Sequence, residues 1–425
     1  MPARLLGSFD ALREREFRLL FGAHAISAIG DFIVPVALAF AVLDLTGSAT
    51  DLGFVLTARL VPLVLFMLAG GVWADRLPRQ KLMIASHLVR LVSQGVLGLL
   101  LVAGHARIWE LVVLQAVHGT ATAFSRPATS GIVPQTVSPE RLHQANGLMW
   151  GAIGVAGFAG PAIAGIVLAV ASAGWAILGD AATFALGAYL LARLRLPPLP
   201  ARQRESFLHE LAAGWREVVS RRWLWTSIAG FAVFQLAVIA AFSVLGPVVA
   251  KRSLGGASAW ATLAAAFGIG SIVGNFLSLH LRPRRPLRFA FAFTLLCFPT
   301  LFLLAFAAPV PVIAATELVS GVAIGMSGAM WETTLQENVP EAALSRVASY
   351  DWMGSMVLRP AGLAAIGPIA SVVGVRAALC GAGLLGVIAN LALLSVREVR
   401  TLERGRPAAP AEEPSFAALD VTAEA

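Results

Sequence analysis

Charged side chains inside long apolar runs are the residues of this chain that can do chemistry. Asp31 lies about midway through the first run, Arg59 and Arg90 lie in the next two, and Glu317 and Arg359 lie in runs near the other end of the chain. A charge at the centre of a bilayer costs about 2.5 to 3.5 kcal/mol on insertion scales, so it is kept only when paired, hydrated or protonated. These five residues are therefore candidates for a proton- or substrate-binding cavity.

Two interpretations are open for Asp31. It is either a proton-binding acid whose charge depends on access to the cavity, or a structural partner of Arg90 or Arg59. Glu317 and Arg359 are expected to form a buried pair, which either orders the helix bundle or is made and broken during transport.

A second set of charged residues is expected near the cytoplasmic ends of the spans. Glu332 and Asp351 are predicted to form inner-gate or surface pairs with Arg346. His and Cys residues show no metal-ligand spacing, and no catalytic set can be assembled. We therefore predict no metal site, no cofactor and no enzymatic activity.

The composition requires a membrane protein. Of the 425 residues, 58% are hydrophobic and only 13% are charged, whereas about a quarter are charged in soluble domains. Unbroken apolar runs of about 20 residues predict membrane-spanning helices and exclude a barrel. The predicted spans are 17–43, 52–74, 81–103, 109–128, 143–171, 174–193, 224–250, 257–281, 288–307, 311–331, 347–373 and 376–396.

The basic residues predict the orientation of these twelve helices. Most of the 32 Lys and Arg residues fall in alternate loops, on the side that also holds both termini. Basic loops stay cytoplasmic, so both termini are expected inside. Arg4, Arg13 and Arg15 precede the first run, so we expect no cleaved signal peptide. The net charge of +8 reflects topology and not a nucleic-acid partner.

The chain divides into two related halves. The polar stretch 195–222 separates six predicted spans from six, and Gln135-Thr-Val-Ser-Pro-Glu140 matches Gln336-Glu-Asn-Val-Pro-Glu341 at the same place in the second half. We predict an all-α fold of two six-helix pseudo-repeats. Its parts are residues 1–194, a cytoplasmic central loop 195–222, residues 223–397 and a disordered tail 398–425.

A charged hairpin links the second and third predicted spans. Gly71, Asp75, Arg76, Arg79 and Lys81 form a Gly-x-x-x-Asp-Arg-x-x-Arg-x-Lys pattern, which resembles the corresponding loop of major facilitator superfamily transporters. That family usually has Gly where this chain has Pro78. The resemblance implies a conformational gate. We expect Asp75 to meet the positive N-terminal end of the eleventh helix, near Val347, and to latch the outward-facing state.

The fifth predicted span carries a further resemblance. Gly147, Gly160, Pro161 and Gly165 look like the helix-five motif of antiporters in this superfamily. Ala156 and Ala164 stand where that motif usually has glycine. Gln115 in the fourth span stands where many drug/proton antiporters have arginine, so proton coupling would have to use other groups.

Several segments resemble one branch of the superfamily, the enterobactin-type siderophore exporters and macrolide efflux proteins. They are Ile29-Gly-Asp31, Arg59-Leu-Val-Pro62, Ser125-Arg-Pro-Ala128 and Trp331-Glu-Thr-Thr-Leu-Gln336. The resemblance implies export of a medium-sized organic compound from a bacterium across its inner membrane by a monomer, driven by protons. The partners would be a small organic substrate, protons and the lipid bilayer. An importer of a small nutrient and a non-transporting receptor or scaffold are the alternatives.

Overall fold

The computed structural model describes residues 10–196, 214–278, 280–281 and 283–404, without the side chains of 68–76, 130, 143, 341, 342 and 345. The side chains of the predicted gate residues Asp75 and Arg76, and the surroundings of Gly71, thus lie outside the described part. Most of the central loop and of the tail lie outside it as well.

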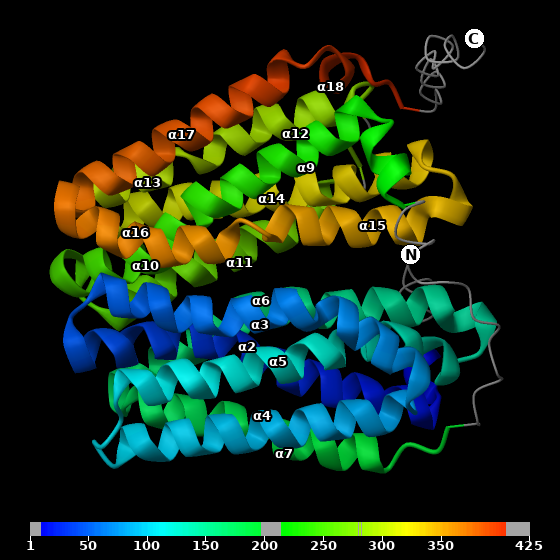
Figure 1. Cartoon of the computed structure of the whole chain (residues 1–425), viewed down its shortest axis with the longest axis horizontal. Helices are drawn as coiled ribbons and strands as arrows, with labels where there is room; N and C mark the ends of the chain where they lie inside the picture. The colour runs from blue at the N-terminus through cyan, green and yellow to red at the C-terminus, as the bar shows by residue number, and fades with distance from the viewer. Residues whose placement is uncertain (1–9, 197–213, 279, 282, 405–425) are drawn as a thin grey trace, which may run out of the picture.

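Helices make up both halves of the chain (Figure 1). The first half contains α2 (Arg15–Thr46), α3 (Ala49–Arg76), α4 (Arg79–Val102), α5 (Ile108–Ile132), α6 (Leu142–Val170) and α7 (Ala173–Ala192). The second half contains α9 (Arg222–Phe234), α10 (Ala240–Val249), α11 (Ala257–Ser278), α12 (Pro286–Thr294), α13 (Pro299–Ala305), α14 (Val310–Asn338), α15 (Glu341–Met356), α16 (Arg359–Val373), α17 (Val375–Ser395) and α18 (Arg397–Thr401). The all-α membrane fold is confirmed.

Eleven helices in the described part of the chain are long and apolar enough to cross a membrane. The predicted fourth span coincides with α5, a 25-residue helix made more polar by Glu110, Gln115 and His118. Its presence is consistent with twelve spans, and the number twelve stays a prediction.

Three predicted spans differ from regular helices. The seventh contains a π-helical turn at Gln235–Ile239, between α9 and α10. The ninth is broken into α12 and α13 just before Pro299, and the eleventh into α15 and α16 just before Pro360. Proline lacks the backbone N–H that would continue the helix, which accounts for the last two breaks.

The two halves form separate layers, with the start of α2 and the helix α18 at one end of the molecule (Figure 1). We call this the terminal end, and the opposite end the distal end. Contacts between the layers are concentrated on two seams, α3 with α16 and α6 with α11.

Glycines allow backbones to meet at both seams. A Cβ on Gly53 would lie 2.3 Å from the Leu363 carbonyl oxygen, and one on Gly268 would lie 2.7 Å from that of Gly157. Each is too close for any side chain, so the seams depend on the absence of one. Lys251 reinforces the distal end by donating to the Leu43 carbonyl at 2.7 Å and by pairing with Asp44.

The hydrophobic core is continuous at one end only. A single cluster joins both halves toward the distal end and includes Val36, Leu52, Val244 and Leu363. At the terminal end each half has its own core, around Phe17 and Ile132 in the first and around Leu335 and Val347 in the second. The halves are therefore sealed together distally and packed independently at the terminal end.

The distal seal predicts a conformational variant. Gly53→Leu should force α3 from α16, because overpacking costs about 1 to 3 kcal/mol and the obstructing atom is backbone. In a Cys297→Ser, Cys380→Ser background, maleimide labelling of Val248→Cys, whose parent residue is 2% exposed, should accelerate about tenfold. Gly95→Leu, where a Cβ meets no atom within 4 Å, is the matched control. Equal labelling in both variants would show that this contact does not hold the distal end closed.

Candidate substrate and proton site

Asp31 is the centre of a charged cluster in the first half. Arg90 of α4 donates through Nη2 to both carboxylate oxygens at 2.6 Å, and Arg59 of α3 donates to Oδ1 at 2.9 Å. Asp31 thus pairs with both neighbouring arginines, and its role as a proton-binding acid stays a prediction. The Asp31 side chain is 30% exposed and that of Arg90 only 4%. One carboxylate thus holds three helices together and still reaches open space.

The aromatic ring of Phe184 packs against the Arg90 guanidinium, and two imidazole rings pack against Phe184. The guanidinium carbon lies 3.8 Å above the centre of the Phe184 ring from α7. His118 and His87 meet the same ring edge-on, with centroids 5.8 and 5.7 Å away. His118 Nε2 is also 3.8 Å from Asp31 Oδ1. Sequence reasoning assigned no role to His118, because only the fold brings it to Asp31.

A second carboxylate, Asp180, lies beside this cluster and was missed by the sequence analysis. It is fully buried on α7, where Gln94 donates to Oδ2 at 2.8 Å and Gln115 donates to Gln94 at 3.1 Å. Its Oδ1 has no hydrogen-bond partner in the described structure. A Cβ on Gly30 would lie 2.1 Å from that oxygen, so the glycine preceding Asp31 makes room for it. The criterion that found Asp31, an acid within an apolar run, would have found Asp180.

The charged cluster lies within one of two packed helical halves, and most of the chain matches a known family. Residues 20–363 match the family model of the Major Facilitator Superfamily. The chain belongs to that superfamily. It is therefore a membrane transport protein and not an enzyme.

Curated relatives of this superfamily member include exporters at low identity. The enterobactin exporter EntS of Shigella boydii is 28% identical over 401 residues, which cover 90% of this chain and 93% of that protein. Macrolide efflux protein A of Streptococcus pyogenes is 23% identical over 270 residues, which cover 62% of this chain and 65% of that protein.

Solved structures share the fold. A bacterial homolog of the human lysosomal transporter Spinster, in an inward-facing and unoccupied conformation, matches with a TM-score of 0.70 at 16% identity, covering 92% of this chain and 98% of that one. The nucleoside transporter NupG matches with a TM-score of 0.71 at 11% identity, covering 89% and 98%. At these identities the likeness concerns the major facilitator fold alone.

The predicted pair of Glu317 and Arg359 is wrong. Within the described residues no ion pair joins them: Glu317 is 4% exposed and lies beside Thr300 of α13. Arg359 begins α16, next to Pro360, whose carbonyl accepts a hydrogen bond from Thr57 of α3 at 3.2 Å. The charged groups that act on Arg359 are Arg59 and Arg126 of the first half, so this arginine lies at the seam between the halves.

The predicted pairs of Arg346 with Glu332 and Asp351 are also absent from the described part of the structure. Asp351 instead accepts a hydrogen bond from Trp331 Nε1 at 2.8 Å and one from Ser355 at 3.4 Å. The gate role of these three residues stays a prediction. In the hairpin, Arg79 donates to the Gly131 carbonyl at the end of α5, and Lys81 is exposed in the first turn of α4.

The glycines of the helix-five motif have different surroundings. A Cβ on Gly160 would lie 2.4 Å from Phe32 Cβ of α2, and one on Gly165 would lie 2.5 Å from Ala261 Cβ of α11. Close packing thus explains these two, and Pro161 lies between them within the continuous helix α6. Gly147 has no atom within 4 Å of its Cβ position, and nothing in the structure explains it.

The cluster around Asp31 predicts strong energetic coupling. Arg90→Gln leaves part of the carboxylate uncompensated and Asp31→Asn leaves two guanidinium groups without their anion, so each should lower the thermal unfolding midpoint. The double variant should recover part of that loss, with a coupling of about 1 to 3 kcal/mol expected for directly bonded groups. Arg376→Gln, at an arginine of the second half that donates to the Ala305 carbonyl, should show no coupling to Asp31→Asn. Additive effects of Arg90→Gln and Asp31→Asn would contradict the cluster.

Proposed function

We propose that this transporter exports a medium-sized organic compound from the bacterial cytoplasm across the inner membrane, by alternating access and in exchange for protons. The outward direction is supported by the relatives named as macrolide efflux protein and enterobactin exporter. With both termini in the cytoplasm, the distal seal faces the outside, and the independent cores of the terminal end belong to an inward-facing state.

The observation that carries the proton step is the sharing of Asp31 between Arg59 and Arg90. Ion pairs at such distances are worth about 4 kcal/mol at an effective dielectric constant near 20. A proton on Asp31 removes that attraction and frees both guanidinium groups. Because the Asp31 side chain is 30% exposed, water can reach the carboxylate and deliver the proton.

Release of Arg59 acts directly on the seam between the halves. Arg59 lies on α3, two residues from Thr57, which hydrogen-bonds to Pro360 of α16. The same helix contacts α16 at Gly53. A change in charge at Asp31 is therefore transmitted through α3 to the contact that must open when the transporter turns outward.

The charged hairpin has the complementary role in this proposal. When the terminal end closes, Asp75 meets the N-terminal end of α15, where a carboxylate is favoured by about 0.3 to 1 kcal/mol. That end is at Glu341, about two turns before Val347, the position expected from the sequence. The distal seam then stabilises the inward-facing state and this latch the outward-facing state. Each transport cycle breaks one of these contacts and forms the other.

Transport by Asp31→Asn protein tests the proton step. In proteoliposomes with an imposed proton gradient, wild-type protein should export a substrate found by screening dyes, macrolides and siderophores, and a protonophore should abolish this export. Asp31→Asn should lower the gradient-driven rate at least tenfold, because its side chain cannot gain and lose a charge. Glu140→Gln, at an exposed carboxylate, should export at the wild-type rate. Wild-type export by Asp31→Asn, with the same protonophore sensitivity, would refute the assigned role.

A further inference from the structure

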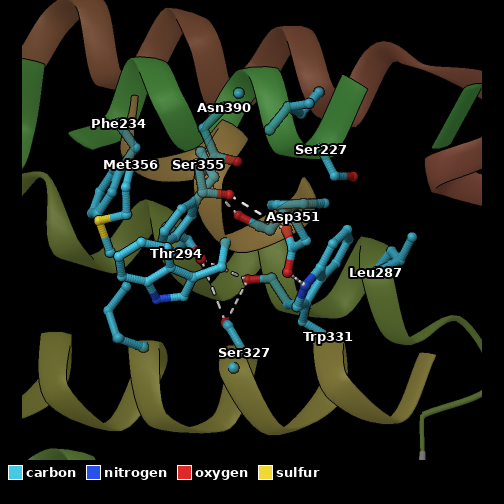
Figure 2. A pocket seen from close by; sticks show the side chains of 18 of the residues that line it. Ser227, Phe234, Leu287, Thr294, Ser327, Trp331, Asp351, Ser355, Met356 and Asn390 are labelled. Atoms are coloured by element: carbon cyan, nitrogen blue, oxygen red, sulfur yellow. Dashed lines mark hydrogen bonds between the residues drawn. The ribbon is translucent and has the colours of Figure 1, made fainter. Parts of the chain in front are cut away.

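A cavity of about 210 Å³ lies inside the second half, away from the Asp31 cluster (Figure 2). Five helices line it: α9, α12, α14, α15 and α17. Six aromatic residues contribute to its walls: Phe231, Phe234, Phe291, Phe298, Trp331 and Trp352. An apolar cavity of about 150 Å³ accommodates benzene, so this one has room for an aromatic ring with a substituent.

The cavity adjoins the interface between the halves. Trp352 lines it, and the guanidinium carbon of Arg126, on α5 of the first half, lies 5.4 Å from the centre of the same ring. Trp352 is thus a residue of the cavity wall that also contacts the first half. The position suits a subsite of the transport path.

The hydroxyl groups of the cavity already donate to the protein. Ser227 donates to the Trp223 carbonyl at 2.7 Å, and Thr294 and Ser327 both donate to the Ala290 carbonyl at 3.0 Å. Figure 2 shows the last of these bonds on the wall of the cavity. These groups therefore have no proton left to offer to a bound molecule.

The cavity groups that can still form hydrogen bonds to a ligand are acceptor oxygens. Asn390 is 5% exposed; its Nδ2 donates to the Phe291 carbonyl at 3.0 Å, while its Oδ1 has no partner. The Asp351 carboxylate accepts from Trp331 and Ser355, and a carboxylate has about four acceptor positions. None of the described residues lining the cavity is basic, so the carboxylate has no cation there.

We infer that this cavity binds the aromatic ammonium portion of an organic cation. The ammonium N–H groups donate to Asp351 and to Asn390 Oδ1, and the ring packs among the tryptophan and phenylalanine rings, which also attract a cation. An anion would meet the charge of Asp351, and a neutral ring would leave that charge without a partner. That this cavity is a substrate subsite rests on the proposed export function. The binding of the cation can be measured without transport.

Three naphthalene probes of similar shape and different charge test the inference: 1-naphthylmethylamine, 1-naphthalenemethanol and 1-naphthoate. Their Kd values for the purified full chain, measured by calorimetry without any gradient, should favour the amine by at least tenfold over the other two, as expected for a charge-assisted hydrogen bond. Equal or tighter binding of the alcohol or the naphthoate by the wild-type chain would overturn the inference.

Two variants locate the binding. Asp351→Asn should raise the Kd of the amine at least tenfold and change the Kd of the alcohol by no more than about threefold. Gly328→Leu should weaken all three probes, because Gly328 lines the cavity and its Cβ would meet no atom within 4 Å, so the new side chain fills the space without a clash. It also serves as the test if Asp351→Asn does not fold.

The matched controls are Glu337→Gln, which removes a carboxylate paired with Arg404 near the end of α14, and Gly381→Leu on α17, where a Cβ also meets no atom within 4 Å. Both should bind like the wild type. Unchanged amine binding by Asp351→Asn or by Gly328→Leu would overturn the site. Asp31→Asn should bind the amine normally even though its export fails, which separates this inference from the proposed proton step.

Discussion

The sharing of one carboxylate between two arginines is the constraint on which the first half depends. Asp31 lies at a depth where an isolated charge is costly, and Arg59 and Arg90 come from two other helices to meet it. The bonds therefore fix the rotation of α2, α3 and α4 about their own axes as well as their separation. Phe184 completes the arrangement, because its ring covers the Arg90 guanidinium on the side away from the carboxylate.

This constraint matters for transport because of where the seams lie. The hydrophobic effect contributes little to the association of helices within a membrane. The halves are therefore held together by close packing of small residues and by a few hydrogen bonds and ion pairs. Gly53 and Gly268 let backbones touch across the seams, and α3 carries both a seam and Arg59. An interface without a large apolar anchor at the terminal end can separate there while the distal cluster stays intact.

Sequence reasoning reached the fold and part of the site because both depend on patterns along the chain. Apolar runs of about 20 residues predict spans, and an acid inside such a run must be paired, hydrated or protonated, which singles out Asp31. The same rule was not applied to Asp180. The Glu317 and Arg359 pair failed for a different reason, since Arg359 lies at the break before Pro360, where charged groups of the first half act on it. The place of a side chain at such a break is not encoded by spacing. His118 and Asn390 are likewise polar groups whose partners are set by tertiary packing.

The carboxylates of the two halves differ in what they can still bind. Asp31 is already compensated by two guanidinium groups, so a cationic substrate would have to displace an arginine, and a proton would have to overcome the attraction of both. Asp351 has only neutral donors, an indole and a hydroxyl, so a cation can approach without removing anything. The carboxylate of the second half is therefore the freer of the two to bind an organic cation. In our proposal, the proton step at Asp31 and the inferred cation site at Asp351 are coupled through the interface of α3 and α16, where Thr57 donates to the Pro360 carbonyl, without direct contact between proton and substrate.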